Sequence, residues 1–282
     1  MNLRSLLSTA VLALAAAPGL AQEQAPEPVR AELQSLLQEW NGAVEAFREE
    51  LAQVPRARQR AYHAKHQPKA SDRTPLFLKI AEDHPKTPSA LEALVWIARY
   101  DGNDNAVVVL QSLAQHHADA PELLEVLERI PLTAATEPHY EALRTTSKHP
   151  DVRGKACWRL ADYTKALYEL ALFFDGPVDE AGIARQRTRY GAAVCEQVRE
   201  RGWEPYAARA LELYRVLGDQ HPELQDRRGK VKDVVAAARF ELEHLVPGKV
   251  APEIEGVDLD GVPFQLSDYR GKVVVLDFWG DW

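Results

Sequence analysis

Apolar residues recur every three or four positions along most of this chain, which is the spacing of one face of an α-helix. The first such stripe predicts a helix that starts near Pro28. A basic run, Pro55–Arg60, comes after it and is typical of a solvated helical face or a linker. We assign residues 22–70 to a leader and this first amphipathic helix. The stripe contains Val29, Leu33, Leu36, Leu37, Trp40, Val44, Phe47 and Leu51.

From residue 71 to residue 245 the same periodicity predicts one helix after another. Thr87-Pro88 is a helix start, since Thr can cap the free N–H groups and Pro fits the first turn. A long apolar helix is expected over 156–174, and further helices over 206–217 and 231–245. No stretch of comparable length alternates as a strand does. The sequence therefore predicts a mainly α fold for 71–245.

Three His-Pro pairs separate these helical patterns at intervals of 65 and 72 residues: His84-Pro85, His149-Pro150 and His221-Pro222. Proline cannot continue the preceding helix, so each pair predicts a corner between two helices. Such recurrence resembles the tetratricopeptide-like repeats of exported bacterial proteins and suggests stacked helical hairpins. A helical bundle without repeats is the alternative.

The pattern changes after Leu245. Residues 254–258 and 262–266 are short extended runs, and Asp260-Gly261 between them is a hairpin turn signal. Val273–Leu276 is aliphatic on both faces, as in a strand at the centre of a sheet. Asp277 directly follows it, where a buried carboxylate must be hydrogen-bonded, protonated or used.

Residues 246–282 resemble the start of a thioredoxin-fold domain of the redoxin type, a group that includes TlpA-like thiol-disulfide oxidoreductases and AhpC/TSA peroxiredoxins. The resemblance rests on four pieces in order. They are Gly248–Pro252, Asp258–Gly261, Leu266–Lys272 and Val274–Trp282. It implies that the chain holds the first β-hairpin and first core strand of an incomplete α/β thioredoxin fold.

In the thioredoxin-like branch a Trp here is followed at once by Cys-x-x-Cys, and Trp282 holds that position. The resemblance implies that Asp277 is the buried proton relay and that Trp279 and Trp282 flank the redox motif. A strand-end Asp bonded to backbone is the alternative for Asp277. The nucleophile itself is absent from the sequence. We hypothesise that the next residue is selenocysteine, whose codon is read as a stop; a frameshift, a fragmentary gene or a true stop after Trp282 are the alternatives.

The two cysteines, Cys157 and Cys195, both lie in predicted helices and form no Cys-x-x-Cys motif. Either they form one structural disulfide or they are small buried apolar residues. His63, His66, His116 and His117 form no ligand spacing with Cys, Asp or Glu, so we expect no metal, and no cofactor is indicated.

The ends and the charge add two expectations. Arg4, the apolar run 6–17 and the small residues to Ala21 predict a signal peptide over 1–21, and hence an exported, periplasmic protein without a transmembrane segment in its mature form. A net charge of −8 argues against nucleic acid as a partner.

Expected partners are disulfide-bearing substrate proteins or a thiol reductant. The function is then an exported thiol, or selenol, disulfide oxidoreductase or antioxidant protein. A periplasmic helical-repeat binding or scaffold protein without catalysis is the alternative.

Overall fold

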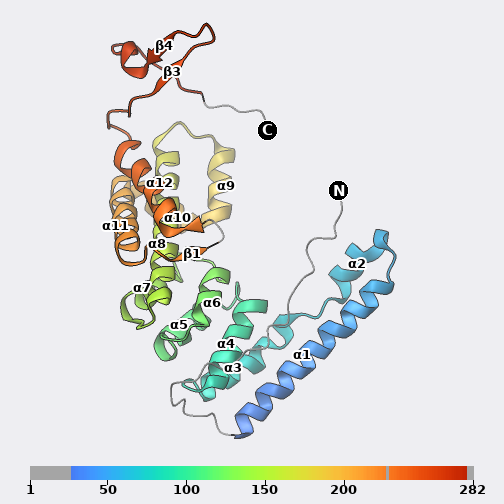
Figure 1. Ribbon diagram of the computed structural model, residues 1–282. Coiled ribbons are helices and arrows are strands. Elements are labelled where there is room, and N and C mark those ends of the chain that lie inside the picture. The colour runs from blue at the N-terminus through green and yellow to red at the C-terminus, as the bar shows by residue number, and fades with distance from the viewer. Residues whose placement is uncertain (1–26, 227–228, 278–282) are drawn as a thin grey trace. The chain divides into compact units, whose positions relative to one another are not determined.

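The computed structural model describes residues 27–226 and 229–277, and within them the fold is mainly α (Figure 1). The helices expected from the apolar periodicity are present. In chain order the helices of the described residues are α1 Glu27–Gln53, α2 Arg56–His66, α3 Thr74–Asp83, α4 Pro88–Tyr100, α5 Ala106–His116, α6 Leu123–Arg129, α7 Glu137–Thr146, α8 Pro150–Asp175, α9 Glu180–Tyr190, α10 Ala192–Arg201, α11 Glu204–Gln220 and α12 Val231–His244. A short 3-10 turn, η1, covers Ala70–Asp72.

Local sequence signals set several of the helix ends. The Oγ1 atom of Thr87 accepts a hydrogen bond from the backbone N–H of Ala90 at 3.2 Å, so Thr87 caps α4 as predicted. Asp179 caps α9 in the same way, through the N–H of Gly182 at 2.7 Å. Between α9 and α10 the chain turns at Gly191, whose φ of 86° lies in the region that favours glycine.

The His-Pro pairs lie at corners, as predicted. His84-Pro85 separates α3 from α4, His149-Pro150 separates α7 from α8, and His221-Pro222 follows α11. The ring of His221 packs so closely on α8 that a Cβ atom at Gly154 would lie 2.8 Å from its Cγ and Nδ1 atoms. The corner after α11 is therefore fixed against the first turn of α8.

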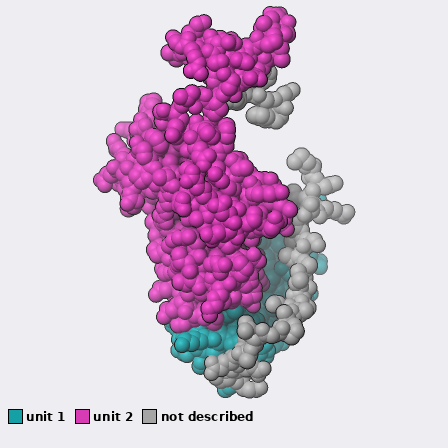
Figure 2. All heavy atoms as spheres, turned by 60° about the vertical axis from the view of Figure 1, so that its left-hand side comes forward, with its two compact units in different colours: residues 1–68, 76–93 teal, residues 69–75, 94–282 magenta. Residues whose placement is uncertain are grey.

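The chain divides into two compact units, which Figure 2 colours separately. Unit 1 comprises residues 1–68 and 76–93, and unit 2 comprises 69–75 and 94–282. In unit 1 the predicted stripe of α1 buries Val29, Leu33, Leu36, Trp40 and Phe47. The basic run lies in α2, which buries no residue, so it forms a solvated helical face as expected.

In unit 2 the core surrounds α8, which packs against α6, α7, α10 and α11. Trp158 of α8 and Tyr140 of α7 are its largest fully buried side chains. The hydroxyl of Tyr140 donates a hydrogen bond to the carbonyl oxygen of Ile130 at 2.8 Å. Lys155, also buried, pairs with Glu128 at 2.6 Å, and its Nζ atom lies 5.7 Å from the centre of the Trp158 ring.

Two antiparallel ribbons interrupt the helical pattern. The first, β1 Gln225–Asp226 with β2 Gly229–Lys230, joins α11 to α12 where we expected only helices. Each of its strands has two residues, too few to show alternation in a sequence. The second is the predicted hairpin: β3 Glu255–Val257 pairs with β4 Pro263–Gln265, and the 3-10 turn η2 Leu266–Tyr269 follows.

Candidate functional site

The segment that follows α12 forms its hairpin through one aspartate. The Oδ1 atom of Asp258 accepts hydrogen bonds from the N–H groups of Asp260 at 2.9 Å and Val262 at 2.8 Å. The N–H of Gly261 donates to the carbonyl of Asp258 at 3.0 Å, and Gly261 takes the φ of 80° that this turn requires. The Asp260-Gly261 signal in the sequence thus produced the expected turn.

Across the hairpin, Gly256 faces Phe264. A Cβ atom on Gly256 would lie 3.0 Å from two atoms of the Phe264 ring. The glycine therefore lets the ring lie over the opposite strand, which gives this small ribbon one side-chain contact of its own.

Two carboxylates fasten η2 to the hairpin. Asp268 accepts a hydrogen bond from the N–H of Gln265 at 2.9 Å, and Glu253 accepts one from the N–H of Ser267 at 3.0 Å. The hydrogen bonds from Ser267 hold the pKa of Glu253 below its ordinary value. Sequence reasoning missed both residues, because the capping side chains of a four-residue 3-10 turn produce no periodic signal.

After η2 the chain continues as an extended aliphatic stretch. Val273 and Val275 are 96% and 87% exposed, and Asp277 is exposed as well. The expected core strand does not form here: residues 273–277 pair with no strand in the part of the chain that the structure describes. A strand needs a neighbour for its backbone N–H and C=O groups, and β3 and β4 pair only with each other. Trp279 and Trp282 lie outside the described residues.

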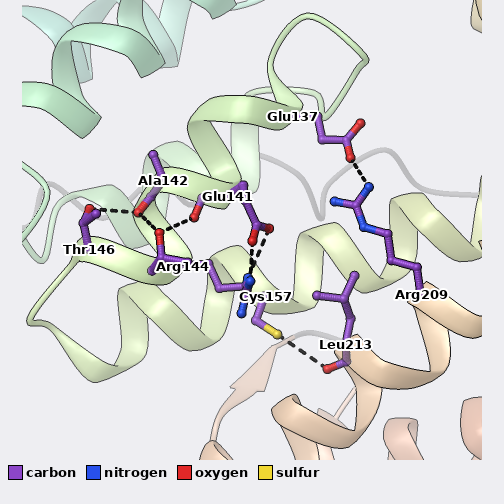
Figure 3. A network of polar contacts seen from close by, with 9 residues as sticks. Glu137, Glu141, Ala142, Arg144, Thr146, Cys157, Arg209 and Leu213 are labelled. Atoms are coloured by element: carbon purple, nitrogen blue, oxygen red, sulfur yellow. Dashed lines mark hydrogen bonds and ion pairs between the residues drawn. The ribbon is translucent and has the colours of Figure 1, made fainter.

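The two sulfur atoms lie elsewhere, in the helical region. Cys157 of α8 and Cys195 of α10 are buried free thiols, so the structure contains no disulfide between them. The Sγ–H of Cys157 donates to the carbonyl of Leu213 at 3.5 Å, beside the Glu141–Arg144 ion pair (Figure 3). Burial raises the pKa of Cys157 to about 11 and also raises that of Cys195. Disulfide exchange requires a thiolate, so neither cysteine has the character of a redox nucleophile.

The histidines of the first helices make aromatic contacts. His63 lies edge-on to Phe47 with ring centres 5.4 Å apart, and His66 stacks on Tyr62 at 4.3 Å. Across residues 27–226 and 229–277 no group of three or more His, Cys, Asp or Glu is placed to hold a metal ion. In those same ranges no helix combines the length and apolarity needed to cross a bilayer.

Known proteins match this chain over a short stretch only. It is 54% identical over 35 residues to thiol-disulfide oxidoreductase ResA of Geobacillus kaustophilus (strain HTA426), which is 12% of this chain and 20% of that protein. It is 45% identical over 40 residues to thiol-disulfide oxidoreductase ResA of Bacillus thuringiensis subsp. konkukian (strain 97-27), or 14% of this chain and 23% of that protein.

The chain thus spans about a fifth of the length of the curated relatives it matches. No protein-family model matches the chain. No solved structure matches it either. The similarity supports a relation to thioredoxin-like oxidoreductases over that short stretch.

Proposed function

We propose that this chain contributes the N-terminal part of a thioredoxin-like domain to an exported thiol-disulfide oxidoreductase, and that the helices preceding it hold partner proteins. The observation that carries the proposal is the local identity of 54% to an oxidoreductase over 35 residues, which is also the length of residues 248–282. The proposal assigns the match to those residues. Their hairpin and the 3-10 turn capped by Glu253 and Asp268 provide a built start for such a domain.

In this proposal the residues of the hairpin and η2 place the aliphatic stretch and Asp277 within the sheet of the complete domain. The hairpin and η2 deliver the aliphatic stretch Val273–Leu276 to the centre of a sheet, where its apolar side chains become buried. Asp277 would then lie at the end of a buried strand, next to the start of the helix that carries the redox motif. A carboxylate there can take or give a proton while a mixed disulfide resolves, which is the role we propose for Asp277.

A segment exchange tests the proposal. Residues 248–282 replace the matching segment of the Geobacillus kaustophilus ResA, and reduction of insulin disulfides is measured. Because the exchange keeps the host's own redox motif, we expect a folded, active enzyme. A second exchange protein carrying Asp277→Asn should fold equally well and resolve mixed disulfides more slowly. A folded exchange protein without reductase activity would refute the assignment of residues 248–282.

A second candidate function is helix-based binding without catalysis. It is favoured by the two buried thiols, because the high pKa of Cys157 leaves the helical region without a reactive sulfur. If the segment exchange fails while the 282-residue chain captures partner proteins in a salt-resistant complex, this second function is the better description.

A further inference from the structure

The second helix of unit 1 is basic along its whole length. α2 carries Arg56, Arg58, Arg60 and Lys65, and all four side chains are exposed. From residue 51 to residue 71 the sequence has no Asp or Glu, although 42 of the chain's 282 residues are acidic. No ion pair joins any of the four cations to a residue within the described ranges. α2 is therefore a local concentration of uncompensated positive charge in an acidic chain.

The charges in the first half of α2 oppose the stability of their own helix. Arg56 and Arg58 lie in the first turn, where the helix dipole favours acidic rather than basic side chains. Arg56 and Arg60 are four positions apart, a spacing at which like charges destabilise a helix. Only Lys65, in the last turn, agrees with the dipole. Because α2 also buries no residue, neither packing nor helix stability accounts for the three arginines, and a binding role does.

One side of α2 rests on the end of α1, beside which it folds back (Figure 1). The Nε2 atom of Gln59 donates a hydrogen bond to the carbonyl oxygen of Val54 at 3.0 Å, and the hydroxyl of Tyr62 donates one to Glu50 at 2.7 Å. The Tyr62 ring also stacks on that of Phe47, with ring centres 6.3 Å apart. These contacts fix which side of α2 faces away from α1.

The side that faces away from α1 carries a row of alanines between two rows of cations. The three alanines recur at helical spacing and are exposed. They are Ala57, Ala61 and Ala64. By the same spacing, Arg56 and Arg60 lie along one border of the row, and Arg58 and Lys65 lie along the other. The small alanines let the long basic side chains of both borders reach one flat surface. We name these seven residues the basic face of α2.

The carboxylates of α1 do not neutralise the basic face. Glu50 is hydrogen-bonded to Tyr62, on the side of α2 that rests on α1. Glu45 and Glu49 are each two positions from Phe47, which places them about 200° around the axis of α1 from the ring that contacts α2. Charges more than about 8 Å away are largely screened at physiological salt, so the local cations decide what this face attracts.

The composition of the basic face favours an extended anionic surface as its partner. The face has no aromatic or large aliphatic side chain, and such side chains anchor most contacts between proteins. Its attraction is electrostatic, is spread over two rows and needs no matching pocket. The headgroups of acidic phospholipids form such a surface, and each Lys or Arg beside it strengthens binding about fivefold. Under the proposed export, lipid rather than nucleic acid is the polyanion within reach of α2.

We propose that the basic face of α2 binds the headgroups of acidic phospholipids and so holds unit 1 at the surface of a bilayer. This binding involves no redox chemistry. It can therefore fail while the proposed oxidoreductase function stands, and it can be demonstrated if that function is refuted.

Co-sedimentation of the 282-residue chain with lipid vesicles tests the proposal. Vesicles of equal parts phosphatidylglycerol and phosphatidylcholine are compared with vesicles of phosphatidylcholine alone, which have no net charge. The double variant Arg58→Gln with Arg60→Gln removes one cation from each border, and Gln is nearly as good a helix former as Arg. We expect its binding to the anionic vesicles to be at least about tenfold weaker than that of the parent. At about 1 M salt, where the screening length is about 3 Å, the two proteins should bind alike.

Two control variants accompany this comparison. Arg189→Gln with Arg199→Gln removes two exposed arginines of unit 2, so it changes the net charge equally and should bind as the parent does. Arg58→Lys with Arg60→Lys keeps both charges and should also bind as the parent does. All of these proteins contain the same apolar run 6–17, so a difference between them reports the substituted residues alone.

Three results would overturn the proposal. The first is equal binding of the parent and the Arg58→Gln, Arg60→Gln variant to the anionic vesicles at low salt. The second is an equal loss of binding in the unit 2 control. The third is retention of the parent on immobilised polyglutamate that anionic vesicles do not displace, because this would identify an acidic protein as the partner.

Discussion

The same substitution at two helical glycines should change stability in opposite directions. Alanine is favoured over glycine in a helix by about 1 kcal/mol. At Gly42 of α1, an added Cβ atom meets nothing within 4 Å. Gly42→Ala should therefore gain most of that amount, about 0.5–1 kcal/mol. At Gly154 of α8, the same atom would lie 2.8 Å from the His221 ring and 3.1 Å from Cδ2 of Leu224.

The clash at Gly154 involves the Cγ atom of His221, near the base of that side chain, so a simple rotation of the ring cannot relieve it. Overpacking of this kind costs about 1–3 kcal/mol. After subtracting the gain in helix propensity, Gly154→Ala should destabilise unit 2 by about 1 kcal/mol. The two substitutions then differ by roughly 2 kcal/mol, more than a tenfold difference in an opening equilibrium.

Native-state hydrogen exchange is the suitable assay, because Gly42 and Gly154 lie in different compact units and each helix reports its own opening. Amides of α1 should exchange more slowly in Gly42→Ala, and amides of α8 faster in Gly154→Ala. If Gly154→Ala slowed exchange in α8 as much as Gly42→Ala slows it in α1, then His221 would not pack on α8 as described.

Three further outcomes are expected. Burial, aided by Arg153, holds the pKa of His221 below its ordinary value of 6.5, so the unfolded chain binds this proton more readily. The stability that the neutral His221 ring contributes is therefore fully present above about pH 6.5 and is lost as the pH falls below that value. In urea unfolding, the free energy of unfolding of His221→Gln should depend less on pH than that of the parent protein. Cys157 and Cys195 should resist a thiol reagent at pH 8 in the native protein and react fully in denaturant; rapid native labelling would contradict their burial. Tyr140→Phe should lower the free energy of unfolding by about 1 kcal/mol, because the hydrogen bond to the buried Ile130 carbonyl is lost, and an unchanged urea midpoint would argue against that bond.

The helical part of the fold could be predicted from the sequence because its information is local. The stripe from Val29 to Leu51 repeats at the helical period, and Thr87 precedes the proline that starts α4. Asp260-Gly261 likewise specified the turn of the terminal hairpin. In contrast, β1 and β2 consist of two residues each and pair only with each other among the described residues, so they are too short to produce a hydrophobic alternation in the sequence.

The candidate site was less predictable, because the burial and the neighbours of its residues depend on contacts between segments that lie far apart in the sequence. Asp277 was expected to be buried, yet burial at that position needs strands on either side of Val273–Leu276, and the described residues supply none. Tyr163, Tyr190 and Tyr206 were missed for a related reason, because they become neighbours only after α8, α9 and α11 have packed.

The concealment of the two sulfur atoms has a consequence for the proposed chemistry. An oxidoreductase works through short-lived mixed disulfides with its clients, and any other accessible thiol on the same chain could intercept them. Cys157 and Cys195 are shielded by helices and kept protonated by that shielding. Under the proposed function, the helical region would therefore hold a client beside a reactive sulfur without offering a competing thiol.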